Sequence, residues 1–259
     1  MGAAEPPPRT LVIVELQGAP PAALAAALGL SAYEAARRAE RGGFHLQRIA
    51  PPAAAGPEAE RLAAAGLRAW LVPEAEVREA ARPRRVRGGA RADRTLTLRV
   101  EEEVLRLGPA AVMLVVRGAI AREYQTVAKR QKVHAATLEG GHRIHLHLQA
   151  GDPPLEIDAL DFEFTDHVGA AVPTLLELSR WVEALAAEVP VDDDFRRLAP
   201  ALAPEEAAAG ALRMVEALRP ARRADAPLVL DNLGQFRFYS AWRGIVERRR
   251  RAEGAPARS

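Results

Sequence analysis

Two long stretches of this chain carry different patterns of apolar residues, and the order of those patterns limits the folds it can adopt. Residues 10–78 alternate between short apolar runs and helical segments, with proline or glycine between them. Residues 94–190 contain mostly short alternating runs, followed by one helical segment. A strand favours strict alternation, whereas a helix favours apolar residues three and four apart. The sequence therefore predicts an α+β protein with a small βαβαβ domain and a separate β-rich domain.

The first stretch predicts three strands with helices between them. Proline is tolerated in the first turn of a helix, which favours a helix start at Pro20 and Pro21. Ser31, with Glu34 three residues later, has the capping-box pattern that starts a second helix. The expected strands are Thr10–Leu16, Phe44–Ile49 and Leu67–Val72, and a third helix is expected over 57–65.

Two short motifs in this stretch, Gly29–Ala36 and Glu60–Ala69, extend the pattern. In the same order, a glycine–leucine step leads into a helix and an acid–leucine–alanine–glycine step leads into a strand. The stretch thus resembles the C-terminal domain of the ribosomal stalk protein. That resemblance implies the same fold and a role in docking proteins through the paired helices. Arg37, Arg38 and Arg41 lie on the corresponding second helix.

Beyond residue 94 the apolar runs predict an antiparallel sheet closed by a helix. Ala111–Arg117 is a continuous apolar run, which favours a central strand, and Gly118 is expected to end it. The polar residues 121–135 are expected to be irregular, and Gly140–Gly141 to form a turn. Other strands are expected at Thr95–Val100, Val104–Leu107, Arg143–Leu148, Leu155–Ile157 and Phe162–Phe164, and the closing helix over 173–188.

A set of strands followed by one amphipathic helix resembles the pleckstrin-homology-like architecture, which occurs in many bacterial proteins. The resemblance is one of topology, because that superfamily has no sequence signature. It implies a scaffold that binds peptides, lipids or other domains and does not catalyse a reaction.

The charge is unevenly distributed along the chain. Residues 78–94 contain seven arginines against two acidic residues, whereas residues 151–216 contain fifteen acidic residues against four arginines. Such asymmetry indicates either surfaces that attract each other or separate surfaces for separate partners. Residues 79–93 are expected to be a solvated, arginine-rich linker between the domains. Residues 191–259 are expected to be a helical extension with a basic tail.

His145 and His147 lie two residues apart in an expected strand, so their side chains point to the same face. Their Cα atoms are then about 7 Å apart, a spacing at which two imidazoles can share one metal ion. Glu156 or Asp158 would have to supply a third ligand. The alternation favours another interpretation, in which the apolar residues between them face the core and the histidines face solvent. We therefore predict no metal site and no other cofactor.

Acidic residues alternate with apolar ones after residue 151. Paired carboxylates are able to bind a cation or transfer protons. Alternation of this kind is also typical of strand positions that face solvent, which is the interpretation we favour. Asp192–Asp194 lack the spacing and the glycine of a calcium loop. The alternating residues are Asp152, Glu156, Asp158, Asp161, Glu163 and Asp166.

Several classes of chemistry lack the residues they need. The chain has no cysteine, which excludes disulfides, thiolate zinc sites, iron–sulfur clusters and cysteine nucleophiles. No serine lies in a glycine-flanked elbow, and the glycine doublets lack the spacing of phosphate-binding loops. The N-terminus lacks a signal-peptide pattern, and no apolar run approaches the ~20 residues of a membrane span. We expect a cytoplasmic protein that is not an enzyme.

The C-terminal segment is rich in aromatic residues and ends in arginines. Phe236, Phe238, Tyr239 and Trp242 lie close together, and Arg248–Arg251 follows. One interpretation is a basic amphipathic helix that binds a membrane surface, a partner or nucleic acid. The favoured interpretation is a helix docked on the core, because the apolar stripe is narrow. Arginines in its last turn also suit the helix dipole.

The sequence thus predicts a non-catalytic protein that acts by binding another macromolecule, in the first place another protein. One alternative is a metal-dependent enzyme that uses His145 and His147. Another is a nucleic-acid-binding protein whose arginines neutralise phosphates. The sequence specifies neither the partner nor the oligomeric state. The candidate binding residues are Arg84, Arg85, Arg87, Arg248, Arg249, Arg250 and Arg251.

Overall fold

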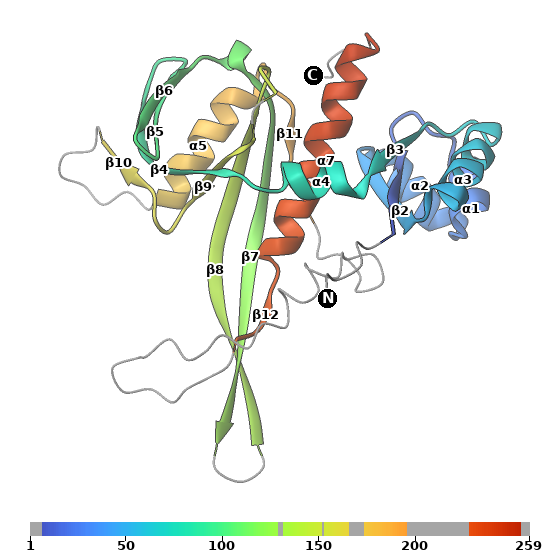
Figure 1. Ribbon diagram of the computed structural model, residues 1–259, viewed down its shortest axis with the longest axis horizontal. Coiled ribbons are helices and arrows are strands. Elements are labelled where there is room, and N and C mark those ends of the chain that lie inside the picture. The colour runs from blue at the N-terminus through green and yellow to red at the C-terminus, as the bar shows by residue number, and fades with distance from the viewer. Residues whose placement is uncertain (1–6, 129–131, 152, 166–173, 196–227, 255–259) are drawn as a thin grey trace, which may run out of the picture. The chain divides into compact units, whose positions relative to one another are not determined.

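A computed structural model describes residues 7–128, 132–151, 153–165, 174–195 and 228–254 of the chain (Figure 1). The chain divides after Glu79 into two compact units, each of which is described by itself below. Helices and strands both contribute, in one antiparallel and one mixed sheet. The predicted α+β class is therefore confirmed.

The N-terminal unit has a three-stranded antiparallel sheet in the order β2-β1-β3, with helices between its strands. The predicted order of elements is the observed one. The third helix begins earlier than expected, because Pro51 and Pro52 already fix the first-turn backbone. The elements are β1 (Thr10–Glu15), α1 (Pro21–Leu28), α2 (Ala32–Arg41), β2 (Phe44–Ala50), α3 (Pro52–Ala64), β3 (Ala69–Pro73) and α4 (Glu74–Ala80).

The start of α2 and the core of this unit follow from the sequence. Ser31 Oγ accepts a hydrogen bond from the Glu34 amide at 3.2 Å, and the Glu34 carboxylate accepts one from the Ser31 amide at 3.0 Å. This reciprocal pair is the predicted capping box. The core is closed by buried aliphatic side chains from the sheet and the helices, among them Val12, Val14, Leu24, Leu62 and Leu67.

The C-terminal unit is built on a nine-stranded sheet in the order β11-β7-β8-β9-β4-β5-β6, with β10 paired to β4 and β12 to β7. Among the described residues of this unit, two α-helices accompany the sheet, α5 (Thr174–Ala186) and α7 (Leu233–Ala252). The strands are β4 (Arg84–Ala92), β5 (Thr95–Val100), β6 (Glu103–Leu107), β7 (Val112–Ala128), β8 (Lys132–Leu148), β9 (Leu155–Asp158), β10 (Glu163–Phe164), β11 (Val191–Asp192) and β12 (Leu228–Asp231).

The sheet is mixed and not purely antiparallel as expected. β4 pairs in parallel with β9 and with β10, and β11 pairs in parallel with β7. In each case a long stretch of chain separates the two strands, and parallel pairing requires such a crossover. The sequence pattern identified most of these strands but carried no signal for their direction.

The arginine-rich segment that we expected to be a linker is strand β4. Residues 84–92 pair with β5 on one side and with β9 on the other. Gly88 and Gly89 lie inside this strand, where a Cβ atom would collide with backbone atoms of the neighbouring strands. Glycine at these positions therefore permits close strand packing and does not indicate a flexible connector.

Of residues 121–135, expected to be irregular, 121–128 and 132–135 belong to two long strands. β7 continues past Gly118 to Ala128, and β8 returns antiparallel to it, with Gln125 opposite Ala135. A ladder of backbone hydrogen bonds needs no apolar side chains, so apolar periodicity missed this part of the hairpin. Gly140 and Gly141 lie within β8, where the register shifts, and do not form a turn.

Gly118 is required by close packing, not by the end of a strand. A Cβ atom there would lie 2.7 Å from the Phe195 ring and 2.9 Å from the Phe236 ring. These two rings contact each other edge-on, with centroids 5.3 Å apart. The strand therefore runs through this position because glycine lets the aromatic rings rest on the backbone.

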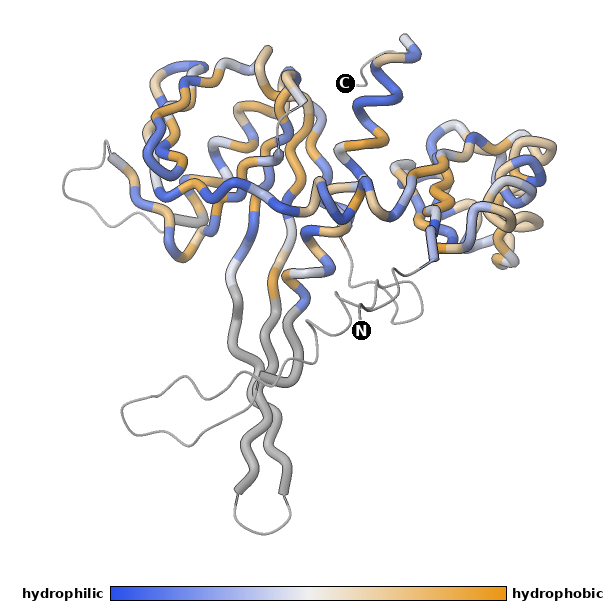
Figure 2. Tube along the Cα trace, in the orientation of Figure 1, coloured by the Kyte–Doolittle hydropathy of each residue, from blue (hydrophilic) through white to orange (hydrophobic). Residues whose placement is uncertain are grey.

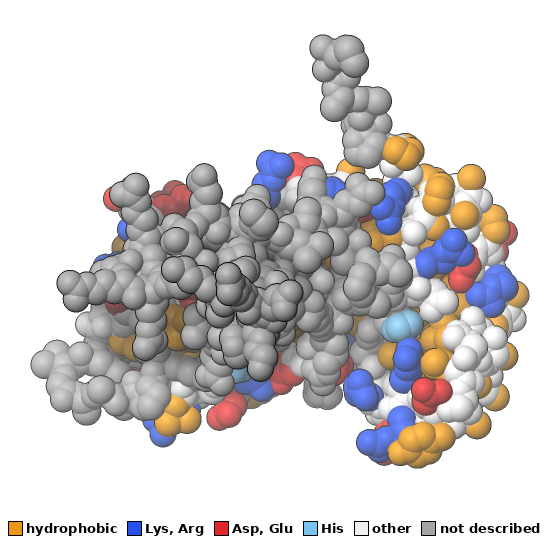
Figure 3. All heavy atoms as spheres, turned by 90° about the horizontal axis from the view of Figure 1, so that it is seen from below, with side chains coloured by type: hydrophobic (Ala, Val, Ile, Leu, Met, Phe, Trp, Pro, Cys, Tyr) orange, Lys and Arg blue, Asp and Glu red, His pale blue; other side chains and the backbone are white. Residues whose placement is uncertain are grey.

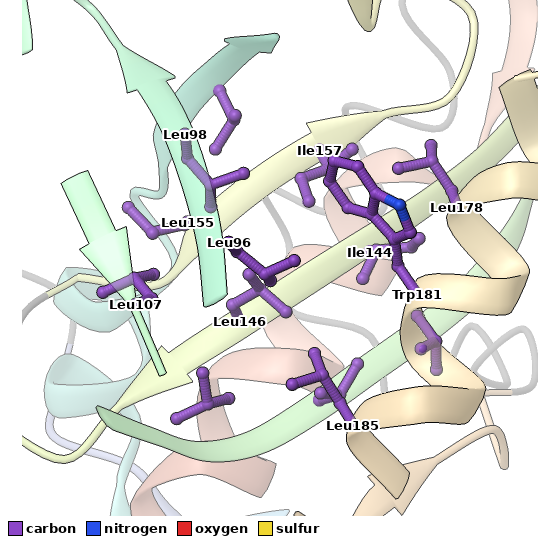
Figure 4. Packing of buried hydrophobic residues seen from close by; sticks show 14 of the residues in the cluster. Leu96, Leu98, Leu107, Ile144, Leu146, Leu155, Ile157, Leu178, Trp181 and Leu185 are labelled. Atoms are coloured by element: carbon purple, nitrogen blue, oxygen red, sulfur yellow. The ribbon is translucent and has the colours of Figure 1, made fainter. Parts of the chain in front are cut away.

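One face of the sheet packs against α5. Leu178, Trp181 and Leu185 project from the helix toward strand residues that include Ile144 and Leu146 (Figure 4). The tube in Figure 2 alternates between hydrophobic and hydrophilic residues along β5, as expected for a strand with one buried face. This cluster is the main apolar core of the C-terminal unit.

The opposite face of the sheet is covered by α7. Along β8, Ile144 and Leu146 join the α5 core, and the alternate residues His145 and His147 contact α7. The aromatic side chains of α7 are all buried, namely Phe236, Phe238, Tyr239 and Trp242. The favoured prediction of a docked C-terminal helix is confirmed.

Candidate functional site

A cluster of buried polar side chains lies between the sheet and α7. Ser240 on α7 contacts two histidines of β8: its Oγ lies 2.8 Å from His145 Nδ1 and 2.8 Å from His147 Nε2. His145 Nε2 lies 3.0 Å from a carboxylate oxygen of Glu156 on β9. Arg237, also on α7, donates two hydrogen bonds to the same carboxylate, at 2.6 and 2.7 Å. Residues far apart in sequence thus form one continuous network of hydrogen bonds.

The Glu156 carboxylate determines which atoms donate and which accept in this network. An ionised Glu156 only accepts hydrogen bonds, so His145 Nε2 must carry a proton. A neutral His145 then accepts at Nδ1, and Ser240 is the donor. The same hydroxyl accepts from His147 Nε2. Every contact is satisfied when both imidazoles are neutral.

Burial and pairing shift the pKa of these groups in the direction that this arrangement requires. Burial lowers the pKa of His145 and, more strongly, that of His147. For Glu156, burial alone would raise the pKa, but the hydrogen bonds from Arg237 and His145 hold it well below its ordinary value. The histidines are therefore neutral and the glutamate is ionised near neutral pH.

A serine, a histidine and a carboxylate in contact are also the components of a nucleophilic triad. Here the arrangement is enclosed: Ser240 and His145 are both 0% exposed, and the Phe236 ring packs on the His145 ring at 4.7 Å. A substrate could reach the Ser240 hydroxyl only if α7 left the sheet. The arrangement links α7 to the sheet. We call this group of residues the clamp: Ser240, Arg237, His145, His147 and Glu156.

The prediction that one face of β8 is exposed to solvent is wrong. We expected His145 and His147 to face water, but α7 buries both because the sheet is covered on its two faces. Within the described ranges, no group of three or more histidine, cysteine, aspartate or glutamate side chains is placed to hold a metal ion. The metal-dependent alternative thus gains no support from this cluster.

The acidic residues after 151 divide into two groups. Asp161 and Glu163 are exposed as expected, and they pair with Arg85 and with Arg99, the latter at 2.7 Å. For Glu156 and Asp158 the prediction of a solvent-facing position is wrong, because both are buried beside arginines. Asp152 and Asp166 lie outside the described residues.

A second buried ion pair joins α7 to β11. Arg243 pairs with Asp192, and the Tyr239 hydroxyl donates a hydrogen bond to the same carboxylate at 2.7 Å. The Asp194 amide also donates to it, at 3.0 Å. Burial of the Tyr239 phenol raises its pKa further above the ordinary range. Asp192 thus links β11 to α7.

Most of the arginines considered for nucleic-acid binding are engaged within the chain. Arg84 pairs with Glu103 at 2.6 Å, and Arg85 pairs with Asp161. In the last turns of α7, Arg250 and Arg251 pair with Glu247 at 3.0 and 2.9 Å. Arg249 is half-buried, and of the candidate arginines Arg87 and Arg248 are exposed and form no ion pair with another described residue. The charge asymmetry is thus partly neutralised inside the unit.

A polar cavity of about 300 Å³ opens beside the Glu156 end of the clamp. It lies between β4, β8, β9 and the first turns of α7. Three arginines and three acidic residues line it, together with two leucines. These are Arg85, Arg143, Arg237, Glu156, Asp158, Asp161, Leu160 and Leu233.

The helix pair of the N-terminal unit presents an aromatic side chain to solvent. Tyr33 at the start of α2 is 74% exposed. Arg37 on the same helix pairs with Glu40 at 3.0 Å, and Arg38 lies against His45, whose pKa burial lowers to about 4. On the face of this unit seen in Figure 3, basic and acidic side chains are interspersed among hydrophobic ones.

Comparison with known proteins gives no match: no family model, no curated protein and no solved structure is similar to this chain. Among the helices that the structure describes, none is both long enough and apolar enough to cross a membrane.

Proposed function

We propose that this protein acts without catalysis, by binding another protein through the β7–β8 hairpin. The observation that carries the proposal is the length of this hairpin: each of its strands has 17 residues, and its outer part extends away from the rest of the sheet (Figure 1). An element that leaves the body of a domain contributes little to its core. Its length is better explained by a contact with something else.

The backbone of the outer hairpin suits a protein partner. β12 pairs with β7 at residues 122–124, and β9 pairs with β8 at residues 143–146. Over 132–139, the described strands give β8 no neighbour other than β7. An open strand edge of this kind offers unpaired amides and carbonyls to which an extended peptide can add.

The enclosed polar cluster supports the non-catalytic part of the proposal. Ser240, His145 and Glu156 form the one constellation in the described chain that resembles a nucleophilic site, and they use their hydrogen-bonding groups on one another. Their burial under α7 explains them as a device that fixes the helix. A stable scaffold carrying a projecting hairpin is the arrangement expected of a binding module.

The experiment shortens the hairpin without disturbing the sheet. Residues 126–134 are replaced by Asn-Gly, which joins Gln125 to Ala135, two residues that already face each other. Asn-Gly favours the two-residue turn of a tight hairpin. Wild-type and shortened proteins serve as baits in the native cell extract. We expect the shortened protein to keep its circular dichroism spectrum and melting temperature and to lose the captured partner.

Two point variants serve as controls. Arg87→Ala and Arg248→Ala alter exposed arginines outside the hairpin and should capture the same partner as the wild type. Capture of the same protein by the shortened bait would refute the proposal. So would recovery of nuclease-sensitive nucleic acid that is lost in the two arginine variants, since that result would favour the nucleic-acid alternative.

A further inference from the structure

The polar cavity beside the clamp is lined by buried charged residues of the sheet and by more exposed charged residues at its rim. The side chains of Arg143 and Glu156 are 5% and 6% exposed. Removing such charges from water is costly, and well-packed apolar residues at the same positions are often at least as stable. Charged side chains that converge on a cavity of about 300 Å³ therefore suggest a ligand.

The carboxylates of the cavity are already occupied as acceptors. Glu156 accepts two hydrogen bonds from Arg237 and one from His145. Asp158 accepts from Arg143 and from the Leu160 amide, the latter at 3.0 Å. The cavity thus offers few acceptors to a ligand, whereas each guanidinium carries five N–H groups.

Arg85 is the arginine that can turn most easily toward a ligand. It pairs with Asp161, and the two side chains are 60% and 55% exposed. An exposed ion pair contributes little to stability, so exchanging this carboxylate for that of a ligand costs little. Arg143 and Arg237 are held in place by buried partners. The cavity therefore combines two fixed guanidiniums with one adjustable guanidinium.

We propose that this cavity binds a small organic molecule through an oxyanion group, a carboxylate or a phosphate. Guanidinium groups bind such oxyanions through paired, charge-assisted hydrogen bonds. Leu233 and Leu160 line the same cavity and provide an apolar surface for the rest of the molecule; Leu160 is 67% exposed at its rim. The inference concerns the body of the C-terminal unit and does not depend on the hairpin.

The test uses four probes with the same phenyl body and the full-length protein. Benzoate and phenyl phosphate carry the two oxyanions, benzamide is neutral, and benzylammonium is a cation. Binding is measured by ligand-observed NMR titration up to about 10 mM, because small fragments bind in the millimolar range. We expect one or both anions to bind and the other two probes not to bind. The anion that binds more tightly identifies the chemistry of the ligand.

Matched variants locate the site. Arg85→Ala should weaken binding of the anion about tenfold, because it removes a charge-assisted contact. Asp161→Asn should tighten it about two- to fivefold, since Arg85 no longer has a competing carboxylate. The exposed Arg99–Glu163 pair lies outside the cavity lining, so Arg99→Ala and Glu163→Gln should change binding less than twofold.

Three results would overturn the proposal. The first is the absence of binding by both anions up to the highest concentration. The second is equal binding of benzamide and benzoate, which would show that the oxyanion is not recognised. The third is an equal effect of Arg85→Ala and Arg99→Ala, which would show attraction to surface charge in general.

Discussion

The hydroxyl of Ser240 connects two imidazoles that are buried, at 0% and 4% exposure. It donates to one and accepts from the other, so a single small side chain satisfies two buried nitrogen atoms. Gly244, one turn further along α7, leaves room for the His147 ring, because a Cβ atom there would collide with it. At the scale of single residues, the docking of α7 depends on a hydroxyl and on the absence of a side chain.

Replacing Ser240 with alanine should destabilise the C-terminal unit by about 1–3 kcal/mol, the cost of leaving buried polar groups without partners. Urea unfolding followed by circular dichroism measures this change. Ser179→Ala on α5 is the control, because Ser179 is half-buried and lines an open cavity. It should change stability by no more than about 0.5 kcal/mol. Equal effects of the two substitutions would contradict the bridging role of Ser240.

The neutral histidines make the stability depend on pH. Their pKa values are lowered in the folded protein and return to about 6.5 in the unfolded chain. The unfolded chain therefore binds more protons as the pH falls. The stability contribution is complete above about pH 6.5 and decreases below it, by about 1 kcal/mol per pH unit for each histidine.

Urea unfolding at about pH 7.5 and pH 5.5 tests this dependence. His147→Gln removes one titrating group and should reduce the difference in stability between the two pH values by about 1 kcal/mol. His142→Gln is the control, since His142 is half-buried outside the clamp, and it should leave the difference unchanged. If the wild type and His147→Gln lose equal stability, the clamp histidines do not carry the effect.

At the scale of elements, periodicity predicted most strands and helices, because their apolar residues pack on one core. Leu96, Leu98 and Val100 of β5 are buried as their alternation predicts. Periodicity could not show that the other face of β8 is also covered, because the covered residues, His145 and His147, are polar. His145 and Ser240 are 95 residues apart, so no local pattern connects them. β4 was missed because arginines and glycines occupy most of its positions.

The Arg243–Asp192 pair gives a prediction about the docking of α7. Both side chains are buried, at 7% and 9% exposure. Arg243→Met should destabilise the C-terminal unit by about 3–5 kcal/mol, because Asp192 loses its cation in a buried position. Arg248→Met, on the exposed side of the same helix, should cost less than about 0.5 kcal/mol. Thermal and urea unfolding of the two variants measure these changes. Similar losses of stability in both would contradict a role for the buried pair.

At the scale of the whole molecule, each of the two units has its own core. Counting the described residues, the N-terminal core draws its side chains from residues 12–69 and the α5 core draws its side chains from residues 86–191. Each core joins its own sheet to its own helices. A division of this kind indicates that the first unit contains the interactions it needs to fold.

A fragment of residues 1–79 should therefore fold when it is produced alone. We expect a cooperative thermal transition and a dispersed amide NMR spectrum, as for a small independent domain. Leu62 is fully buried in this core, and Leu62→Ala should cost about 2–5 kcal/mol, enough to unfold much of a fragment of this size. A fragment without a cooperative transition would show that the first unit needs the rest of the chain.

The position of α7 in the chain has a consequence for synthesis on the ribosome. The helix follows the strands that it covers, so that side of β8 and β9 is exposed to solvent until α7 has been synthesised. The exposed side of these two strands carries polar residues that water solvates well, namely Arg143, His145, His147 and Glu156. An apolar surface in the same place would attract other nascent chains. On β8 and β9, we therefore expect the polar side chains under α7 to limit aggregation until the helix is made.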